Sequence, residues 1–442
     1  MVSDPQTRNP SASGRKLLSS AVQAAALALA LPVLAVAFLF GSVSSRLRRA
    51  QGSSPRLVWV GNPALAQALT SRALRDAGYE SIAVAFRDSG NAVALHYDSV
   101  LALEGRRLPG FRALQQQLRY YLAFAKALAS YDVLHSYFDG GYLKLTPLRD
   151  HEFAVWKWAG KRLVLMPYGS DAFDYDNLPD LPIYTRLKEV YPRTREERAA
   201  IRTDIMRGIR HADCVVGAVC HTVNLPRVDV WPVLWYPYPE PQDVKPAKPG
   251  APHRIAHATN HPRLKGTEAL KRAVAKLRSE GIKVDLDVIS GVPHADVMAR
   301  IQQADIFVDQ LLFGYAMAAI EAASLGKVVV TNLDFPHGQA VFREHSYLDA
   351  CPFLSADEQT IENVLRSALS QPEALATLGG RCRDYVESHH SPRAVVELFG
   401  SVYDAIWYGK ATRLSGLYTP QAASSGAGTG SGGLEPSATQ AL

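Results

Sequence analysis

The spacing of apolar and polar residues predicts two successive α/β units. In the second half of the chain, residues 306–308 and 328–330 are short apolar runs rich in β-branched side chains, which fit strands. Residues 315–325 between them are strong helix formers that end at Gly326, a residue suited to follow a helix C-terminus. The pattern therefore predicts a strand, a loop, a helix and a second strand.

A βαβ unit of this kind places the helix N-terminus beside the carboxyl ends of the strands, where backbone N–H groups favour an anion. Gly314 precedes the predicted helix at the point where the backbone would approach that anion. Glu321 lies further along the helix, so its carboxylate can face the same crevice and accept hydrogen bonds from a sugar diol. A bound nucleotide would supply both groups.

A second pair of elements lies upstream. Residues 254–258 predict a strand, residues 259–267 a loop and residues 268–279 a helix. Arg263 and Lys265 are in the loop, next to the helix start. Two cations beside backbone N–H groups form a clamp for a diphosphate, so both halves predict a nucleotide-diphosphate site.

The first half of the chain predicts another open α/β sheet. The expected strands are residues 56–60, 82–86, 131–135, 161–166 and 212–216, and the expected helices are residues 65–77, 110–129 and 193–210. We expect residues 174–192, rich in Tyr and Pro, to form a long loop at the edge of a cleft, and residues 226–252 to link the two units. Arg112 and Arg119 make the helix at 110–129 basic. It lies near the membrane or the acceptor, or it presents an ordinary solvated face.

Three strand ends in this half carry candidate site residues. Gly61 follows the first strand and either cradles a phosphate or forms a structural turn. Asp171, in the loop after residues 161–166, can orient an acceptor hydroxyl or stabilise developing positive charge; the alternative is an N-cap or Asx turn. Tyr168 lies in the same loop, and His135 ends another strand, where a core position is the alternative.

Residues 17–43 contain no charged side chain and are dense in Ala, Leu and Val. At about 1.5 Å per residue, this run is long enough to cross a hydrocarbon core of roughly 30 Å, so we predict a membrane anchor. Pro32 also allows a kinked helix or a re-entrant hairpin. The alternative is a cleaved signal peptide, but the apolar run continues through residues 38–40, and a secreted protein would meet no nucleotide for the predicted site.

Composition narrows the possible partners. The chain has 442 residues, 47% of them hydrophobic, which suffices for two domain cores. A formal net charge of +6 suits anionic lipid or phosphate, while the absence of a basic-aromatic array or zinc-finger spacing gives no reason to expect nucleic acid. Four cysteines without metal-ligand spacing indicate a reducing compartment and no metal site.

These motifs resemble the GT-B glycosyltransferases of the large family-4 group, which transfer sugars from nucleotide donors with retention. Arg263, Lys265 and Glu321 match the family's diphosphate-binding Arg and Lys and the second, ribose-facing Glu of its Glu-x7-Glu pattern. Phe313 stands where the family has the first Glu, which helps to position the donor sugar. Gly314 and Tyr315 match the start of the family's Gly-Phe-Gly segment, and Asp309 and Gln310 are candidates to replace the missing Glu.

The resemblance also extends to the first half, where the strand ends at His135 and at Tyr168–Asp171 match stretches that line the family's cleft; the family often has His where Tyr168 stands. It implies an α/β GT-B fold with two Rossmann-like domains facing a cleft, here with an N-terminal transmembrane helix.

The implied boundaries are as follows. We expect a tail at 1–16, an anchor at 17–45, an acceptor domain at 54–240, a donor domain at 252–385, a helix returning to the first domain at 386–410 and a disordered tail at 411–442.

The predicted function is sugar transfer from a nucleotide-diphosphate donor to a lipid-linked or cell-surface polysaccharide precursor, without metal or cofactor. The expected location is the membrane, with the catalytic body in the cytoplasm. Two alternatives remain. One is a catalytically silent scaffold that binds nucleotide or glycan, suggested by Phe313 and Tyr168. The other is a sugar-nucleotide epimerase, against which the apolar segment argues because a soluble donor needs no anchor.

Overall fold

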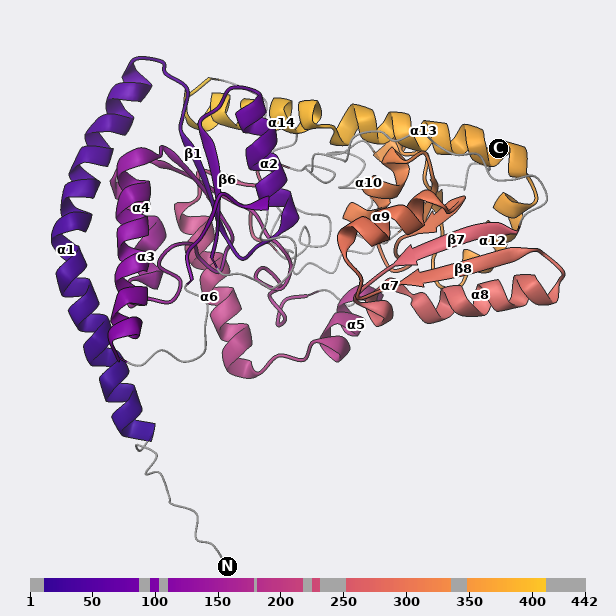
Figure 1. Cartoon of the computed structure of the whole chain (residues 1–442), viewed down its shortest axis with the longest axis horizontal. Helices are drawn as coiled ribbons and strands as arrows, with labels where there is room; N and C mark the ends of the chain where they lie inside the picture. Colours follow the sequence, from indigo (N-terminus) through magenta and orange to yellow (C-terminus); the bar gives the residue numbers. More distant parts are fainter. Residues whose placement is uncertain are drawn as a thin grey trace, which may run out of the picture.

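Two parallel sheets with helices on their faces confirm the α/β prediction (Figure 1). The computed structural model describes residues 12–86, 96–102, 110–178, 181–217, 225–230, 252–334 and 348–410. Most of the predicted linker and the whole predicted C-terminal tail lie outside these residues.

The first part of the chain contains α1 (Ala12–Ala50), β1 (Leu57–Gly61), α2 (Leu65–Asp76), β2 (Ser81–Ala85), β3 (Ser99–Val100), α3 (Gly110–Ser130), β4 (Val133–Ser136), η2 (Arg149–His151), α4 (Glu152–Trp158), β5 (Arg162–Leu165), α5 (Pro182–Val190), α6 (Arg195–His211) and β6 (Cys214–Val215). The second part contains β7 (His253–Ala258), α7 (Pro262–Lys265), α8 (Thr267–Ser279), β8 (Val284–Ile289), α9 (His294–Gln302), β9 (Ile306–Val308), α10 (Met317–Ser324), β10 (Val328–Thr331), η4 (Leu348–Ala350), β11 (Leu354–Ser355), α12 (Ile361–Leu369), α13 (Pro372–His390) and α14 (Pro392–Ile406).

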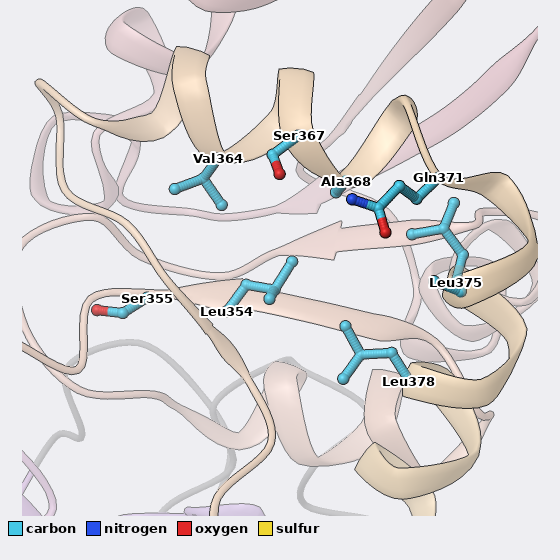
Figure 2. A pocket seen from close by; sticks show the side chains of 9 residues that line it. Leu354, Ser355, Val364, Ser367, Ala368, Gln371, Leu375 and Leu378 are labelled. Atoms are coloured by element: carbon cyan, nitrogen blue, oxygen red, sulfur yellow. The ribbon is translucent and has the colours of Figure 1, made fainter. Parts of the chain in front are cut away.

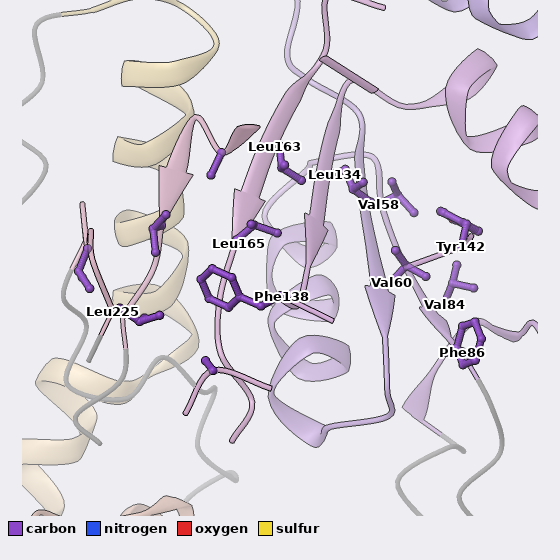
Figure 3. Packing of buried hydrophobic residues seen from close by; sticks show 14 of the residues in the cluster. Val58, Val60, Val84, Phe86, Leu134, Phe138, Tyr142, Leu163, Leu165 and Leu225 are labelled. Carbon is purple, nitrogen blue, oxygen red and sulfur yellow. The ribbon is translucent and has the colours of Figure 1, made fainter. Parts of the chain in front are cut away.

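The first sheet has the order β3-β2-β1-β4-β5-β6 and buries both faces. Alternate residues of each strand face opposite ways, so Val58 and Val60 enter one core and Leu57 and Trp59 the other. Figure 3 shows the first core, where apolar side chains of neighbouring strands meet. α1, α3 and α4 supply side chains to this core, and α2 and α14 supply the second.

The second sheet has the order β11-β10-β9-β7-β8. Buried residues of α8 and α12 cover one face, and those of α10 and α13 cover the other. α13 and α14 follow one another across both units (Figure 1). Ser391 separates them, and its hydroxyl accepts the N–H of Ala394 at 3.2 Å, which starts α14 before its Pro at the first position. The apolar stripe of α14, including Phe399 and Val402, is buried against the first unit.

Two expectations about individual elements were wrong. Residues 174–192 are not a continuous loop, because Pro182 begins α5 at a helix N-terminus, where its missing N–H costs nothing. The N-terminal segment is one uninterrupted helix through Pro32, so the re-entrant alternative is also wrong. This helix, α1, is long and apolar enough to cross a membrane, yet it lies along the first unit beside α3 (Figure 1).

Candidate functional site

Each sheet has one point where its strand order reverses. In the first sheet this point lies between β1 and β4, and in the second it lies between β7 and β9. The connections that leave neighbouring strands here turn to opposite faces of the sheet, which opens a crevice at the carboxyl ends of the strands. Among the described residues, one polar cluster lies at each of these two points.

In the second unit, Lys265 and Asp309 meet across the reversal point. Lys265 ends α7, which follows β7, and Asp309 directly follows β9. The Lys265 ammonium lies 2.5 Å from Oδ1 of Asp309, whose carboxylate is fully buried. The other oxygen, Oδ2, accepts the N–H of Ala316 just before α10 begins. Asp309 therefore fixes both a cation and the entry to α10, and both its oxygens are engaged within the protein.

The loop between β9 and α10 is held by several further hydrogen bonds. Gly314 has a φ of +52°, a left-handed conformation that glycine adopts without strain. Its carbonyl oxygen accepts hydrogen bonds from the Thr331 hydroxyl and from the Gln310 side chain. The Gln310 amide also donates to the carbonyl of Phe313 at 2.8 Å. Asp309 and Gln310 thus support this loop, and neither supplies an uncommitted carboxylate in place of the missing Glu.

Glu321 lies one turn into α10 and pairs with His294. Nε2 of His294, at the start of α9, is 2.8 Å from Oε1 of Glu321. The hydrogen bond to Glu321 raises the pKa of His294 against the opposing effect of burial. The Glu321 side chain is 9% exposed and that of His294 is 50% exposed. A diol that approaches Glu321 would therefore meet the imidazole first.

Arg263 and Lys265 point to different partners. The side chain of Arg263 is 66% exposed, and its guanidinium lies 3.4 Å from Glu189 of α5, in the first unit. The two predicted diphosphate-binding cations are therefore separately engaged in this state. Arg186 of α5 reinforces the same contact between the units through two hydrogen bonds to Glu358, at 2.7 and 3.1 Å.

The side chain of Tyr315 lies in the core and not in the crevice, where it was predicted. Its side chain is 3% exposed, and its hydroxyl lies 2.8 Å from that of Tyr385 and 3.2 Å from Nε2 of His390. Both partners belong to α13, which covers the sheet. The ring of Tyr315 is therefore a core element, and only its backbone borders the crevice.

In the first unit, a polar cluster bridges the reversal point. Nδ2 of Asn62, after β1, lies 3.1 Å from Oδ2 of Asp139, after β4. The Tyr168 hydroxyl, after β5, donates to the same carboxylate oxygen at 3.1 Å and accepts from Asn62 at 2.9 Å. The Lys144 ammonium forms an ion pair with Asp139. Burial and the nearby carboxylates raise the pKa of Tyr168, so its phenol stays protonated and can donate a hydrogen bond.

Asp171 is buried beneath this cluster. Its carboxylate accepts the N–H groups of Tyr168 and Gly169, both at 3.0 Å, and that of Phe138 at 3.3 Å. The donors all precede Asp171 in the chain, so these contacts are neither the N-cap nor the Asx turn given as the alternative; they join the loops after β4 and β5. Burial, with a contribution from Asp139, raises the pKa of Asp171. Its side chain is 5% exposed, so contact with an acceptor remains a prediction.

His135 and Gly61 occupy structural positions. His135 is fully buried, stacks on Trp59 with ring centroids 3.7 Å apart, and lies 3.0 Å from the Tyr403 hydroxyl of α14. The expected catalytic position of His135 is therefore corrected to a core position under α14. At Gly61, a Cβ atom would lie 2.4 Å from the ring of Tyr137, so close packing requires the glycine.

Four residues of these clusters were not predicted as site residues: Asn62, Asp139, Lys144 and His294. Asn62 and Asp139 could have been found, because both follow predicted strands that meet at the reversal point. For His294, the only indication in the sequence was its position after Pro293 at the start of a helix.

A separate cavity of about 200 Å³ lies between α12, α13 and β11 (Figure 2). Its nine lining residues, among them Leu354, Leu375 and Leu378, carry no charge. This apolar cavity does not offer the groups that a diphosphate requires.

No family model and no curated protein matches the chain. Solved structures with a similar arrangement include Anabaena HepE in complex with UDP-glucose, with 12% identity and a TM-score of 0.48; the match covers 79% of this chain and all of that one. UDP-GlcNAc 2-epimerase from Neisseria meningitidis, bound to UDP-GlcNAc, has 11% identity and a TM-score of 0.42 over 79% of this chain and 99% of that one.

A mutant form of the O-GlcNAc transferase of Thermobaculum terrenum has 15% identity and a TM-score of 0.44 over 80% of this chain and 68% of that one. At TM-scores below 0.5, these similarities assign neither a family nor an activity to the chain.

Proposed function

We propose that this protein transfers a sugar from a nucleotide-diphosphate donor to a lipid-linked or cell-surface polysaccharide precursor at the membrane. The observation that carries the proposal is the grouping of Lys265, Asp309, His294 and Glu321 around the reversal point of the second sheet. A cation and a carboxylate at such an edge suit the diphosphate and the ribose of one nucleotide.

In the proposed reaction, the bond between the anomeric carbon and the diphosphate oxygen breaks, and the acceptor oxygen forms a new bond to that carbon. Lys265 would exchange Asp309 for the leaving diphosphate and stabilise its charge without a metal. Arg263 would turn from Glu189 toward the same group as the units close. Glu321 would hold the ribose, with His294 beside it.

The cluster around Asp139 supports a role for the first unit at the acceptor. Asp139 is 15% exposed and can accept the proton that the acceptor hydroxyl loses, while Tyr168 can donate a hydrogen bond to the acceptor or the donor sugar. Retention of configuration is proposed from the resemblance to family-4 enzymes alone.

The test is nucleotide release by membranes that contain the full-length protein, incubated with a panel of nucleotide sugars and a lipid extract. We expect release that requires both the extract and one donor, and we expect the Arg263→Ala/Lys265→Ala double variant to lose it. Release by the double variant at the wild-type rate would contradict the proposal.

A second candidate is a catalytically silent scaffold that binds nucleotide or glycan. Phe313 favours it, because the resemblance predicts an acidic side chain there and the neighbouring Asp309 is committed to Lys265 and Ala316. This candidate predicts saturable donor binding with no release from any nucleotide sugar in the presence of lipid extract.

A further inference from the structure

α1 has two faces with different environments. Buried residues occur at every third or fourth position of α1: Ala26, Ala30, Leu34, Ala37, Gly41 and Ser45. The four apolar side chains belong to the same core as Tyr121, Phe124 and Leu128 of α3. The spacing places this buried stripe on one side of the helix, against the first unit.

Contacts at the C-terminal part of the stripe fix α1 to the protein body. A Cβ atom on Gly41 would lie 1.9 Å from the carbonyl oxygen of Leu128, so the two helix backbones touch. The Ser45 hydroxyl donates to buried Asp132 at 2.5 Å and accepts from buried Lys161 at 2.9 Å. Ser45 can form these two hydrogen bonds only when α1 lies on the first unit.

Another side of α1, roughly 110° around the helix from the buried stripe, exposes large apolar side chains. Leu29, Val33, Val36, Phe40, Val43 and Leu47, which we call the apolar face, are each between 47% and 68% exposed. They extend over about 27 Å at 1.5 Å per residue. An exposed apolar surface of this extent indicates contact with a membrane or another protein.

The charges around the apolar face favour an anionic lipid surface. Neither α1 nor α3 contains an Asp or a Glu. Arg46 of α1 and Arg112, Arg119 and Lys126 of α3 are exposed. Trp158 is 66% exposed and ends α4 two residues before Gly160, which lies beside Arg46. Cations and an exposed Trp at the border of an apolar surface are typical of proteins at a membrane interface.

A second copy of the chain fits less well. A symmetric pair would place the apolar face against itself and bring the same cation-bearing borders together, with no carboxylate from α1 or α3 to offset them.

We propose that α1 does not cross the membrane but lies in the plane of one leaflet, with its apolar face among the acyl chains and the cations of α1 and α3 at anionic head groups. In a crossing orientation, the buried stripe at the middle of the apolar segment would draw α3, with Arg112, Arg119 and Lys126, into the hydrocarbon. In the plane, the face enters the membrane by about 5–10 Å and the buried stripe keeps its contacts. This inference does not depend on the proposed sugar transfer.

The first test is flotation of the full-length protein with vesicles of phosphatidylcholine alone and with added phosphatidylglycerol. We expect Val36→Glu/Phe40→Glu to reduce vesicle binding at least tenfold, while the control change Met206→Glu, at an exposed apolar position of α6, leaves it unchanged. Arg112→Gln/Arg119→Gln/Lys126→Gln should remove the preference for anionic vesicles, and Arg393→Gln on α14 should not. Thermal unfolding establishes that each variant is folded.

The second test separates an in-plane helix from a crossing helix. The single substitutions Thr7→Cys and Gln51→Cys flank the apolar segment and are labelled with an impermeant maleimide in inverted membrane vesicles, against the wild-type background. The proposal predicts equal labelling of both positions before permeabilisation. Labelling of only one position would overturn the proposal. It would also be overturned if the wild type is a dimer and Val36→Glu/Phe40→Glu makes it monomeric while the variant still floats with vesicles like the wild type.

Discussion

The hydrogen bond between His294 and Glu321 makes the protonation of the crevice depend on pH. Because the hydrogen bond to Glu321 raises the pKa of His294, we expect Glu321→Gln to lower that pKa toward its ordinary value, measured by the pH titration of the imidazole by NMR. The pair stabilises the fold fully below the unfolded-state pKa of His294, and this stabilisation is lost as pH rises through the folded-state pKa. An unchanged titration in the variant would show that the pair does not form in solution.

Asp139 provides a test of the acceptor side. We expect Asp139→Asn to reduce nucleotide release by about 100-fold, within the usual range for loss of a general base, while donor affinity stays the same. The matched control is Asp150→Asn, an exposed carboxylate paired with Arg207 on the same unit. Equal rates for the two variants would remove Asp139 from the reaction.

At this scale the sequence predicted where polar residues gather but not what they contact. Local spacing alone placed Lys265 and Asp171 in loops after strands and Glu321 within a helix. Their partners come from distant segments, so the commitment of Asp309 to Lys265 and of Asp171 to three N–H groups required the folded chain. His135 was misplaced because a strand residue near the carboxyl end can also face a helix-covered core.

The packing of α1 on α3 requires a glycine at position 41 of the buried stripe. We expect Gly41→Ala to lower the free energy of unfolding by about 1–3 kcal/mol, because the added methyl meets the Leu128 backbone. Gly380→Ala is the matched control, since a Cβ at this position of α13 has no heavy atom within 4 Å. Denaturant unfolding compares both with the wild type, and equal stability of Gly41→Ala would mean that α1 does not rest on α3.

Element types followed from the periodicity of apolar residues, whereas the location of α1 and the nature of α5 did not. The apolar composition of residues 17–43 fits a membrane anchor. The same helix also carries small residues spaced from Ala26 to Ser45, and this spacing indicates packing on a protein surface. α5 was hidden among Tyr and Pro residues, although Pro182 is well suited to begin a helix.

On the scale of the whole molecule, the two units resemble each other in plan. Each has a parallel sheet with one reversal point, and each reversal point carries a polar cluster. α5 joins the units through Arg186 and Glu189, and α14 returns from the second unit to the first. The two-sheet α/β class was predictable from alternating strand and helix patterns, and the return of a C-terminal helix to the first unit was expected from the resemblance. The contacts of α5 with the second unit were not predicted.

The proposed function requires the crevice of the second unit to bind the nucleotide diphosphate of a donor. Calorimetric titration of a panel of nucleoside diphosphates into the full-length protein measures this binding. We predict one saturable site for at least one nucleotide. Lys265→Ala and Glu321→Ala should each weaken it about tenfold or more, as expected for a lost hydrogen bond to a charged group.

Glu268→Ala, on the exposed side of α8 with Lys271 as its partner, is the control and should bind like the wild type. Unchanged affinity in both crevice variants, or no binding of any nucleoside diphosphate, would rule out a nucleotide site in this crevice.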